Sequence, residues 1–227
     1  GQGVKTYGFD INPSVIYYNS SIRDKFTIIK LLIGISNFLN MSKPQLLSEL
    51  SKDFSSEKIR LIIYIDKMSR IFIEEKEKIH TFFFPFKLRV DNNKYTLFSN
   101  DAEISNVTCS VMSAIFNNFS DEESLEFILE QYWDVADDLG LPKEEEKVYS
   151  KLITYLLTFE SGYLRLDHDE SERGRGKREV HPIDHIDCNY TDGASFKLGL
   201  SSSIACSDLI DILDINTPCT CLSLPRK

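Results

Sequence analysis

The chain has 227 residues and a formal net charge of −9, with 42% hydrophobic and 27% charged residues. A chain of this size and composition buries a sizeable apolar core, so it needs no disulfide framework to fold. The acidic balance argues against a protein whose whole surface binds nucleic acid, because such binding comes largely from Lys and Arg side chains that displace counterions.

The N-terminal part, residues 12–75, is predicted to be mainly helical. Asn12, followed by proline at the first helical position, is typical of a helix start, and the helical pattern ends near Asn40. Residues 58–75 are ambiguous, because the apolar spacing suits a helix whereas the density of β-branched side chains suits strands. Within this stretch, residues 71–73 favour a strand.

Residues 79–98 predict a β-hairpin. Apolar residues occupy every second position from Phe82 to Val90, with Lys87 and Arg89 as the polar residues between them, and the alternation resumes after two asparagines at 92–93. If these asparagines form a two-residue type I′ turn, Val90 lies opposite Tyr95 and the apolar side chains of both strands share one face.

Residues 104–159 predict three helices. The first covers residues 104–119, where apolar residues recur at the spacing of one helix face. Residues 120–123 form a capping box for the second helix, Gly140 ends it, and Pro142 opens the third. The second and third helices carry much of the acidic charge, which predicts a solvated surface or, as the alternative, a surface that binds another protein.

Residues 163–200 return to β structure, and residues 207–213 predict a closing helix. Alternating polar and apolar side chains predict strands at 164–169, 186–190 and 196–200.

The faces of the last two strands determine their register. A two-residue turn at 192–193 would mix polar and apolar side chains on one face. We therefore expect a loop with an odd number of residues, one of them in the left-handed conformation. In this register Tyr190 pairs with Phe196, and Cys188 pairs with Leu198.

Because strands and helices come in runs rather than in alternation, the sequence predicts one α+β domain that spans residues 1–227. We expect an antiparallel sheet built from the hairpin and the C-terminal strands, packed against the helices of residues 104–159. The same order argues against a parallel sheet with helices between its strands.

The predicted register places charged side chains on one face of the C-terminal strands, if the strand at 164–169 neighbours the last two. An acid, a base and a fixed cation in one place can run acid–base or phosphoryl-transfer chemistry. The alternative is a solvated sheet face that collects such residues without any function. The candidate catalytic residues are Arg165, Asp167, His181, His185, Asp187 and Lys197.

His181 and His185 have the spacing of a helical zinc-binding pair. Pro182 takes His181 out of helical geometry, however, and the residues that follow alternate like a strand. On a strand the two histidines lie about 13 Å apart at ~3.3 Å per residue, too far to share an ion unless the chain bends at Pro182. The sequence also lacks a phosphate-binding loop, a dinucleotide fingerprint and a nucleophile elbow, so we predict neither a metal nor a cofactor.

The expected location is the cytoplasm. Five cysteines without the spacing of a secreted scaffold predict free thiols in a reducing compartment. No signal peptide is visible, and polar residues interrupt the longest apolar stretch, 28–39, so we expect no membrane association. Another protein is the expected partner. Nucleic acid is disfavoured by the net charge, and the basic cluster at 173–178 is either a solvated loop or an anion-binding arm beside a site.

The C-terminal motifs resemble a known bacterial family. Residues 164–169, a charged loop, the motif His-Pro-x-x-His that begins at His181, an aromatic-containing strand and a closing helix resemble the C-terminal part of the family called domain of unknown function 2290. The likeness covers about the last quarter of the chain. It implies a bacterial protein associated with defence systems, without an established activity. It also implies that Arg165, Asp167, His181 and His185 belong to one unit.

Two functional hypotheses follow from different classes of protein. The first is an enzyme or enzyme subunit that acts on phosphodiesters, such as a defence nuclease. In it His185 is the acid–base group, His181 is its partner, and Arg165 and Lys197 stabilise the anion. The second is a non-catalytic component that binds another protein through its acidic helices and uses the two histidines only to brace the fold.

Overall fold

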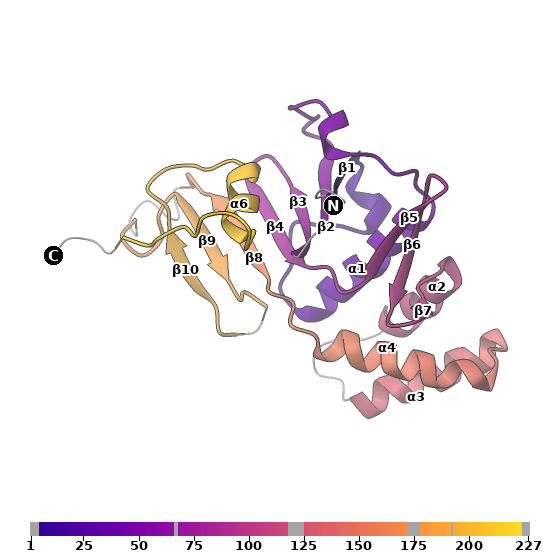
Figure 1. Ribbon diagram of the computed structural model, residues 1–227. Helices are drawn as coiled ribbons and strands as arrows, with labels where there is room; N and C mark the ends of the chain where they lie inside the picture. The colour runs from indigo at the N-terminus through magenta and orange to yellow at the C-terminus, as the bar shows by residue number, and fades with distance from the viewer. Residues whose placement is uncertain (1–4, 66–67, 118–124, 172–177, 192, 224–227) are drawn as a thin grey trace.

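The computed structural model describes residues 5–65, 68–117, 125–171, 178–191 and 193–223. Within these residues it has the predicted α+β architecture: a seven-stranded antiparallel sheet, a separate three-stranded sheet, and helices packed around them (Figure 1). No helix in this part of the chain has the length and apolar character that a membrane span requires.

The large sheet joins N-terminal strands to C-terminal strands. Every neighbouring pair is antiparallel, and the two parts meet where β4 pairs with β8. In their order across the sheet, the strands are β1 (Lys5–Ile11), β2 (Ile59–Ile65), β3 (Ser69–Glu74), β4 (Lys78–Phe83), β8 (Leu164–His168), β9 (Asp184–Cys188) and β10 (Phe196–Gly199).

The expectation of a mainly helical N-terminal part, residues 12–75, is wrong for its second half, where β2 and β3 pair with each other. The side chains of β2 pack on both faces of the sheet: Leu61 and Ile63 lie in one core cluster, and Ile62 lies in the other. A strand buried on both faces shows no alternation, which is why its periodicity was ambiguous. The β-branched side chains were the better signal.

The first half of this part is helical as expected, but less so than predicted. Helix α1 (Lys25–Asn40) ends at the predicted residue. Asn12 caps only a short 3₁₀ helix, η1 (Pro13–Ile16), by accepting a hydrogen bond from the backbone N–H of Ser14. A second 3₁₀ helix, η2 (Leu47–Glu49), precedes β2.

The predicted hairpin lies in the three-stranded sheet, which consists of β5 (Lys87–Asp91), β6 (Lys94–Ser99) and β7 (Ala102–Glu103). Its register is as predicted, with Val90 opposite Tyr95. The two turn residues Asn92 and Asn93 have φ angles of 51° and 59°, as a type I′ turn requires.

The start of the hairpin was placed too early. The alternating segment 82–90 is divided at Pro85, so that β4 joins the large sheet and the hairpin begins with β5. Proline has no N–H to donate and cannot continue a strand within a sheet. We expected the large sheet to contain the hairpin and the C-terminal strands. The hairpin instead lies in a separate sheet, and β4 is the strand that pairs with the C-terminal strands.

The helices predicted for the middle region and for the C-terminal end are present. They are α2 (Asn106–Phe116), α3 (Leu125–Leu139), the 3₁₀ helix η3 (Lys143–Glu145), α4 (Glu146–Thr158) and, near the C-terminus, α6 (Cys206–Leu213). Gly140 follows α3 with a φ of 63°, a conformation that ends a helix. The capping box predicted at residues 120–123 lies outside the described residues.

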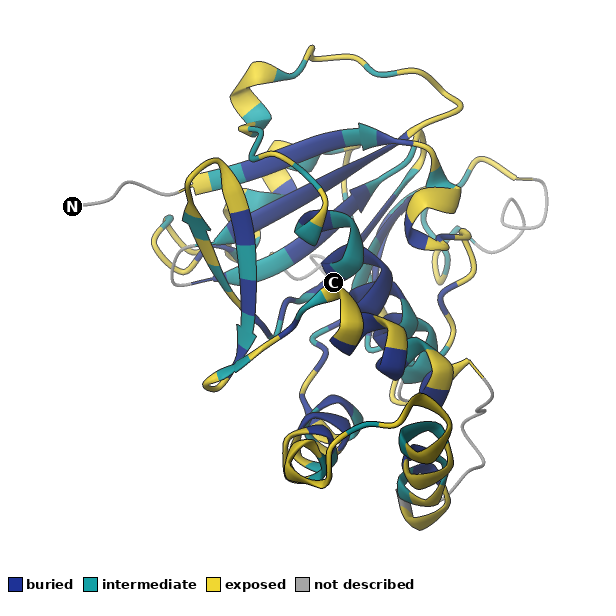
Figure 2. Ribbon diagram, turned by 90° about the vertical axis from the view of Figure 1, so that its right-hand side faces the viewer, coloured by how far each residue is buried: buried dark blue, intermediate teal, exposed yellow. Residues whose placement is uncertain are grey.

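The two faces of the large sheet are covered by different helices. On one face, α1 packs against β1–β3, and Phe9 contacts Phe38 of α1 edge to face. On the opposite face, α6 inserts Leu209 into a second apolar cluster that includes Leu166 and Ile186 of the C-terminal strands. In Figure 1, β8, β9 and β10 lie to one side of α1, and Figure 2 shows α1 and the adjacent strands as the most buried part of the fold.

The C-terminal strands have the predicted faces in a different register. Phe196 pairs with Cys188 and Leu198 pairs with Ile186, two residues from the predicted pairing. A shift of two residues keeps every side chain on its face, so the alternation could not distinguish the two registers. The connecting loop is correspondingly longer, and Gly193 within it has a φ of 68°.

Candidate functional site

One row of side chains crosses all seven strands on the sheet face that α1 partly covers. Direct cross-strand partners share a face, so the pairings define the row. The row is apolar over β1–β3 and polar from β4 onward. From β1 to β10, it consists of Phe9, Leu61, Ile73, His80, Arg165, Asp187 and Lys197. In the adjacent row, Asp167 of β8 pairs with His185 of β9.

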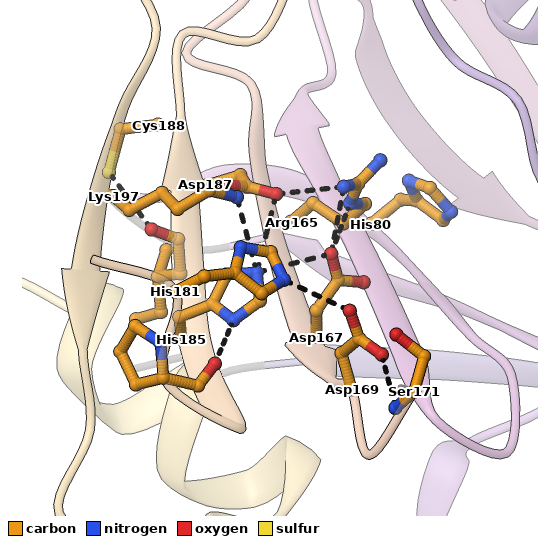
Figure 3. Close-up of polar contacts among 12 residues, drawn as sticks. His80, Arg165, Asp167, Asp169, Ser171, His181, His185, Asp187, Cys188 and Lys197 are labelled. Carbon is orange, nitrogen blue, oxygen red and sulfur yellow. Dashed lines mark hydrogen bonds and ion pairs between the residues drawn. The ribbon is translucent and has the colours of Figure 1, made fainter. Parts of the chain in front are cut away.

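Arg165 and Lys197 hold two carboxylates in a network of ion pairs (Figure 3). Arg165 donates from Nε to Oδ2 of Asp167 at 2.8 Å and from Nη2 to Oδ2 of Asp187 at 2.7 Å. Lys197 donates from Nζ to Oδ1 of Asp187. The structure thus brings together the charged residues that the sequence placed on one face, because β8, β9 and β10 are neighbours.

Neighbouring charges determine the ionisation of this network. Burial alone would raise the pKa of Asp187, but the ion pairs with Lys197 and Arg165 outweigh it and lower the pKa. Burial opposes the charge of Arg165 as well, and the nearby Asp167, Tyr163 and Asp187 together raise its pKa. Arg165 and Asp187 therefore both carry their charge at neutral pH.

His185 is fixed in one orientation within this network. Its Nδ1 lies 2.8 Å from the carbonyl oxygen of Pro182. A carbonyl oxygen can only accept, so Nδ1 carries a proton and donates this hydrogen bond. Nε2 faces the carboxylates, 3.6 Å from Oδ2 of both Asp167 and Asp187, and lies 3.4 Å from Nζ of Lys197.

The cluster is more buried than the solvated sheet face that was the alternative interpretation of these residues. Asp167, His185 and Asp187 are 6%, 1% and 2% exposed. The Oδ1 of Asp167 is buried and has no hydrogen-bond partner among the described residues. Arg165 and Lys197 form the accessible edge, with side chains that are 15% and 34% exposed.

His181 lies against His185, with 4.7 Å between the ring centroids, so the separation expected for a strand is wrong. The chain bends at Pro182, and His181 precedes β9. Its Nε2 is 2.9 Å from Oδ2 of Asp169. The carboxylate accepts this hydrogen bond, which directs Nδ1 away from Asp169 as the available base. Hydrogen bonds from Ser171 and from His181 lower the pKa of Asp169.

Sequence reasoning did not select several residues of the site. Asp169 orients His181, and its only signal was its place in the alternating segment. The ring of Tyr190 lies under the guanidinium of Arg165 at 4.8 Å, a cation–π contact that depends on the loop after β9. His80 continues the polar row on β4 and contacts the hydroxyl of Tyr163 through Nδ1 at 2.8 Å.

The basic cluster predicted at 173–178 lies mostly outside the described residues; only Arg178 is described. Arg178 donates to the backbone carbonyls of Asp169 at 2.9 Å and Ser171 at 3.3 Å. In this position Arg178 braces the backbone that carries Asp169, rather than contributing a cation to the cluster.

The arrangement combines a base, two carboxylates and two cations. His181, held by Asp169, can transfer a proton at Nδ1. Among the described residues, one group of His, Cys, Asp and Glu side chains could hold a metal ion: Asp167, His185 and Asp187, whose ligand atoms lie within 4.8 Å of one another.

Comparison with known proteins gives no further guidance. No family model matches the chain, and no curated protein or solved structure is significantly similar to it. The resemblance of the C-terminal motifs to the family called domain of unknown function 2290 therefore stays a prediction.

Proposed function

We propose that this protein is an enzyme that cleaves phosphate esters, with phosphodiesters as its preferred substrate class. The observation that carries the proposal is the network of Arg165, Asp167, His185, Asp187 and Lys197, whose carboxylates and histidine are buried, on a sheet face that is apolar over β1–β3. Well-packed hydrophobic residues often stabilise a protein as much as buried ion pairs, or more. Fold stability alone therefore gives little reason for charges here, whereas a functional site needs them.

The individual groups suit an anionic substrate. Arg165 and Lys197 are the partly exposed members, and guanidinium and ammonium groups bind phosphate oxygens through charge-assisted hydrogen bonds. The dyad of His181 and Asp169 supplies an oriented base at the accessible side of the cluster. In this assignment His181 transfers the proton, and the buried His185 organises the carboxylates.

The proposal can be tested with chromogenic esters and a matched pair of histidine variants. We expect the purified chain to hydrolyse bis(p-nitrophenyl) phosphate faster than p-nitrophenyl phosphate. His181→Ala should lower the rate on the order of 10²–10⁴-fold without loss of folding, as the removal of a general base does. His168→Ala is the control, because His168 pairs with Asp184 on the opposite face of the same strands. Full activity in His181→Ala, or no hydrolysis of either ester, would refute the proposal.

The origin and location of the enzyme are further parts of the proposal. The C-terminal resemblance supports a bacterial protein with a role in defence. All five cysteines are free, which supports a cytoplasmic place for the activity.

A second candidate function is binding of another protein through α3. This helix exposes large apolar side chains among its acidic residues: Phe127, Trp133 and Leu139 are 38%, 45% and 57% exposed. Exposed aromatic residues of this kind are enriched at protein interfaces. If a cellular phenotype were lost in Trp133→Ala and kept in His181→Ala, binding rather than catalysis would be the function.

A further inference from the structure

Three buried side chains of the cluster have the geometry of a metal site. Nε2 of His185 lies 3.6 Å from Oδ2 of Asp167 and 3.6 Å from Oδ2 of Asp187. Ligand atoms that surround a tetrahedral ion at about 2.1 Å lie about 3.4 Å from one another. The two separations from His185 are therefore close to what a shared ion requires, and all three ligand atoms lie within 4.8 Å of one another.

The orientation of His185 is a second, independent observation. A histidine that binds a metal through one nitrogen usually donates its other N–H to a carbonyl or a carboxylate, which fixes the tautomer. His185 donates from Nδ1 to the carbonyl of Pro182 and turns Nε2 toward both carboxylates (Figure 3). The ring is thus held in the orientation that a metal ligand needs.

Asp167 provides the third observation. Its side chain is more than nine-tenths buried, and its Oδ1 has no hydrogen-bond partner among the described residues. A buried carboxylate oxygen without a partner costs free energy, and such groups in native proteins call for an explanation such as an ion. Oδ2 faces His185 and accepts from Arg165, so an ion gives Oδ1 a partner when both oxygens of this carboxylate coordinate it.

We propose that Asp167, His185 and Asp187 bind one divalent cation of the Mn²⁺ or Zn²⁺ class. One imidazole nitrogen and two carboxylate oxygens suit these ions better than Mg²⁺, which prefers oxygen ligands alone. Three protein ligands leave a coordination position open for water or a phosphate oxygen. The catalytic use of the ion rests on the proposed function, whereas the binding itself does not.

The charges of the cluster determine what a bound ion must compete with. Asp167 and Asp187 are already paired with Arg165 and Lys197, so the ion must displace part of these contacts. A divalent cation adds two positive charges beside the partly exposed Arg165 and Lys197. The loaded site then attracts an anion such as a phosphodiester, and the ion is the largest local charge acting on it.

The test is titration of the metal-stripped full chain with MnCl₂, followed by calorimetry and by thermal unfolding. Mn²⁺ is the probe because exposed cysteine sulfurs such as that of Cys219 bind it weakly. We expect one ion per chain and a melting temperature that rises by several degrees at saturation. Asp167→Asn, which keeps the shape of the side chain, should weaken binding at least ~100-fold, more than the loss of an outer-sphere partner does.

Two control variants show whether binding depends on these ligands. His181→Ala should bind Mn²⁺ as the unaltered chain does, because His181 contacts Asp169 and is not a ligand. Asp10→Asn should do the same, because it breaks a comparable ion pair, with Arg60, at the other edge of the sheet. Lys197→Met should tighten binding severalfold, since it removes a cation that competes for Asp187.

The outcomes separate the metal site from the enzyme. No binding by the unaltered chain, or equal binding by Asp167→Asn, overturns the metal site. Hydrolysis of bis(p-nitrophenyl) phosphate that persists in a chain without Mn²⁺ affinity would leave the proposed function standing and remove the ion from it. Mn²⁺ binding that depends on Asp167, without hydrolysis of either ester, would establish the site and refute the proposed function.

Discussion

The two halves of one sheet face differ in chemistry although their backbone geometry is continuous. On β1–β3 the central row carries Phe9, Leu61 and Ile73, which are packed under α1. On β8–β10 the same row carries Arg165, Asp187 and Lys197, and these strands lie to one side of α1. The helix packs on the apolar half, whereas in the polar half Arg165 and Lys197 are partly exposed beside the buried Asp187.

The difference indicates that stability and function are separated along the sheet. Burial of one large apolar side chain contributes about 1.5–3 kcal/mol, and β1–β3 bury several. On β8–β10 the apolar contribution comes from the opposite face, where Leu166 and Ile186 pack against Leu209 of α6. The apolar burial that stabilises these strands therefore does not depend on their charged face.

The largest effect on stability is expected in the apolar half. Ile73 is fully buried in the apolar half of the row, so Ile73→Ala should lower the free energy of unfolding by about 2–5 kcal/mol through lost burial and a residual cavity. Chemical denaturation measures this change. A loss below about 1 kcal/mol would show that this half is not the stabilising part of the sheet.

The two neighbouring histidines should differ in their contribution to stability. His185 is buried and bonded to the carbonyl of Pro182, so His185→Ala should cost about 1–3 kcal/mol by leaving that carbonyl unpaired. The side chain of His181 is 27% exposed, and His181→Ala should stay within about 0.5 kcal/mol of the unaltered chain. Equal costs in thermal melts would contradict the assignment of the two histidines to different roles.

At the boundary between the halves, His80 should make stability depend on pH. Burial lowers the pKa of His80, so below about pH 6.5 the unfolded chain takes up a proton at this residue that the folded chain does not. The folded state is therefore favoured above that pH and loses stability as the pH falls toward 5. In His80→Gln, which cannot take up this proton, the decrease in melting temperature between pH 7 and pH 5 should be smaller. An unchanged decrease would show that other groups cause it.

The smallest effect is expected at the exposed end of the row. The side chain of Lys197 is 34% exposed, and its partner Asp187 keeps its ion pair with Arg165 when Lys197 is removed. Lys197→Met should therefore change the free energy of unfolding by no more than about 0.5 kcal/mol. A loss of several times this size in urea denaturation would mean that the ion pair does hold the fold.

Parts of the site that depend on strand alternation could be predicted from the sequence. Arg165 and Asp167 alternate with apolar residues on one strand, as Asp187 does on the next, and period-two alternation determines which residues share a face. The same period explains the error in register, since a shift of two residues preserves both faces. Alternation also failed for β2, where both faces are buried.

Contacts that depend on bends and loops could not be predicted in this way. His181 meets His185 because the chain turns at Pro182, and it meets Asp169 across the loop that joins β8 to β9. Neither contact follows from spacing along the chain. The burial of the cluster was also beyond the sequence, because polar side chains on a strand usually indicate a solvated face.

The separation of stability from function is tested most directly by an apolar replacement of the charged network. The four substitutions Arg165→Met, Asp167→Val, Asp187→Val and Lys197→Met remove both carboxylates and both cations together. We expect the free energy of unfolding to stay within about 1 kcal/mol of the unaltered chain, or to rise, while phosphodiester hydrolysis is lost. A fall of more than about 3 kcal/mol would contradict this separation, because it would show that the charges stabilise the fold themselves.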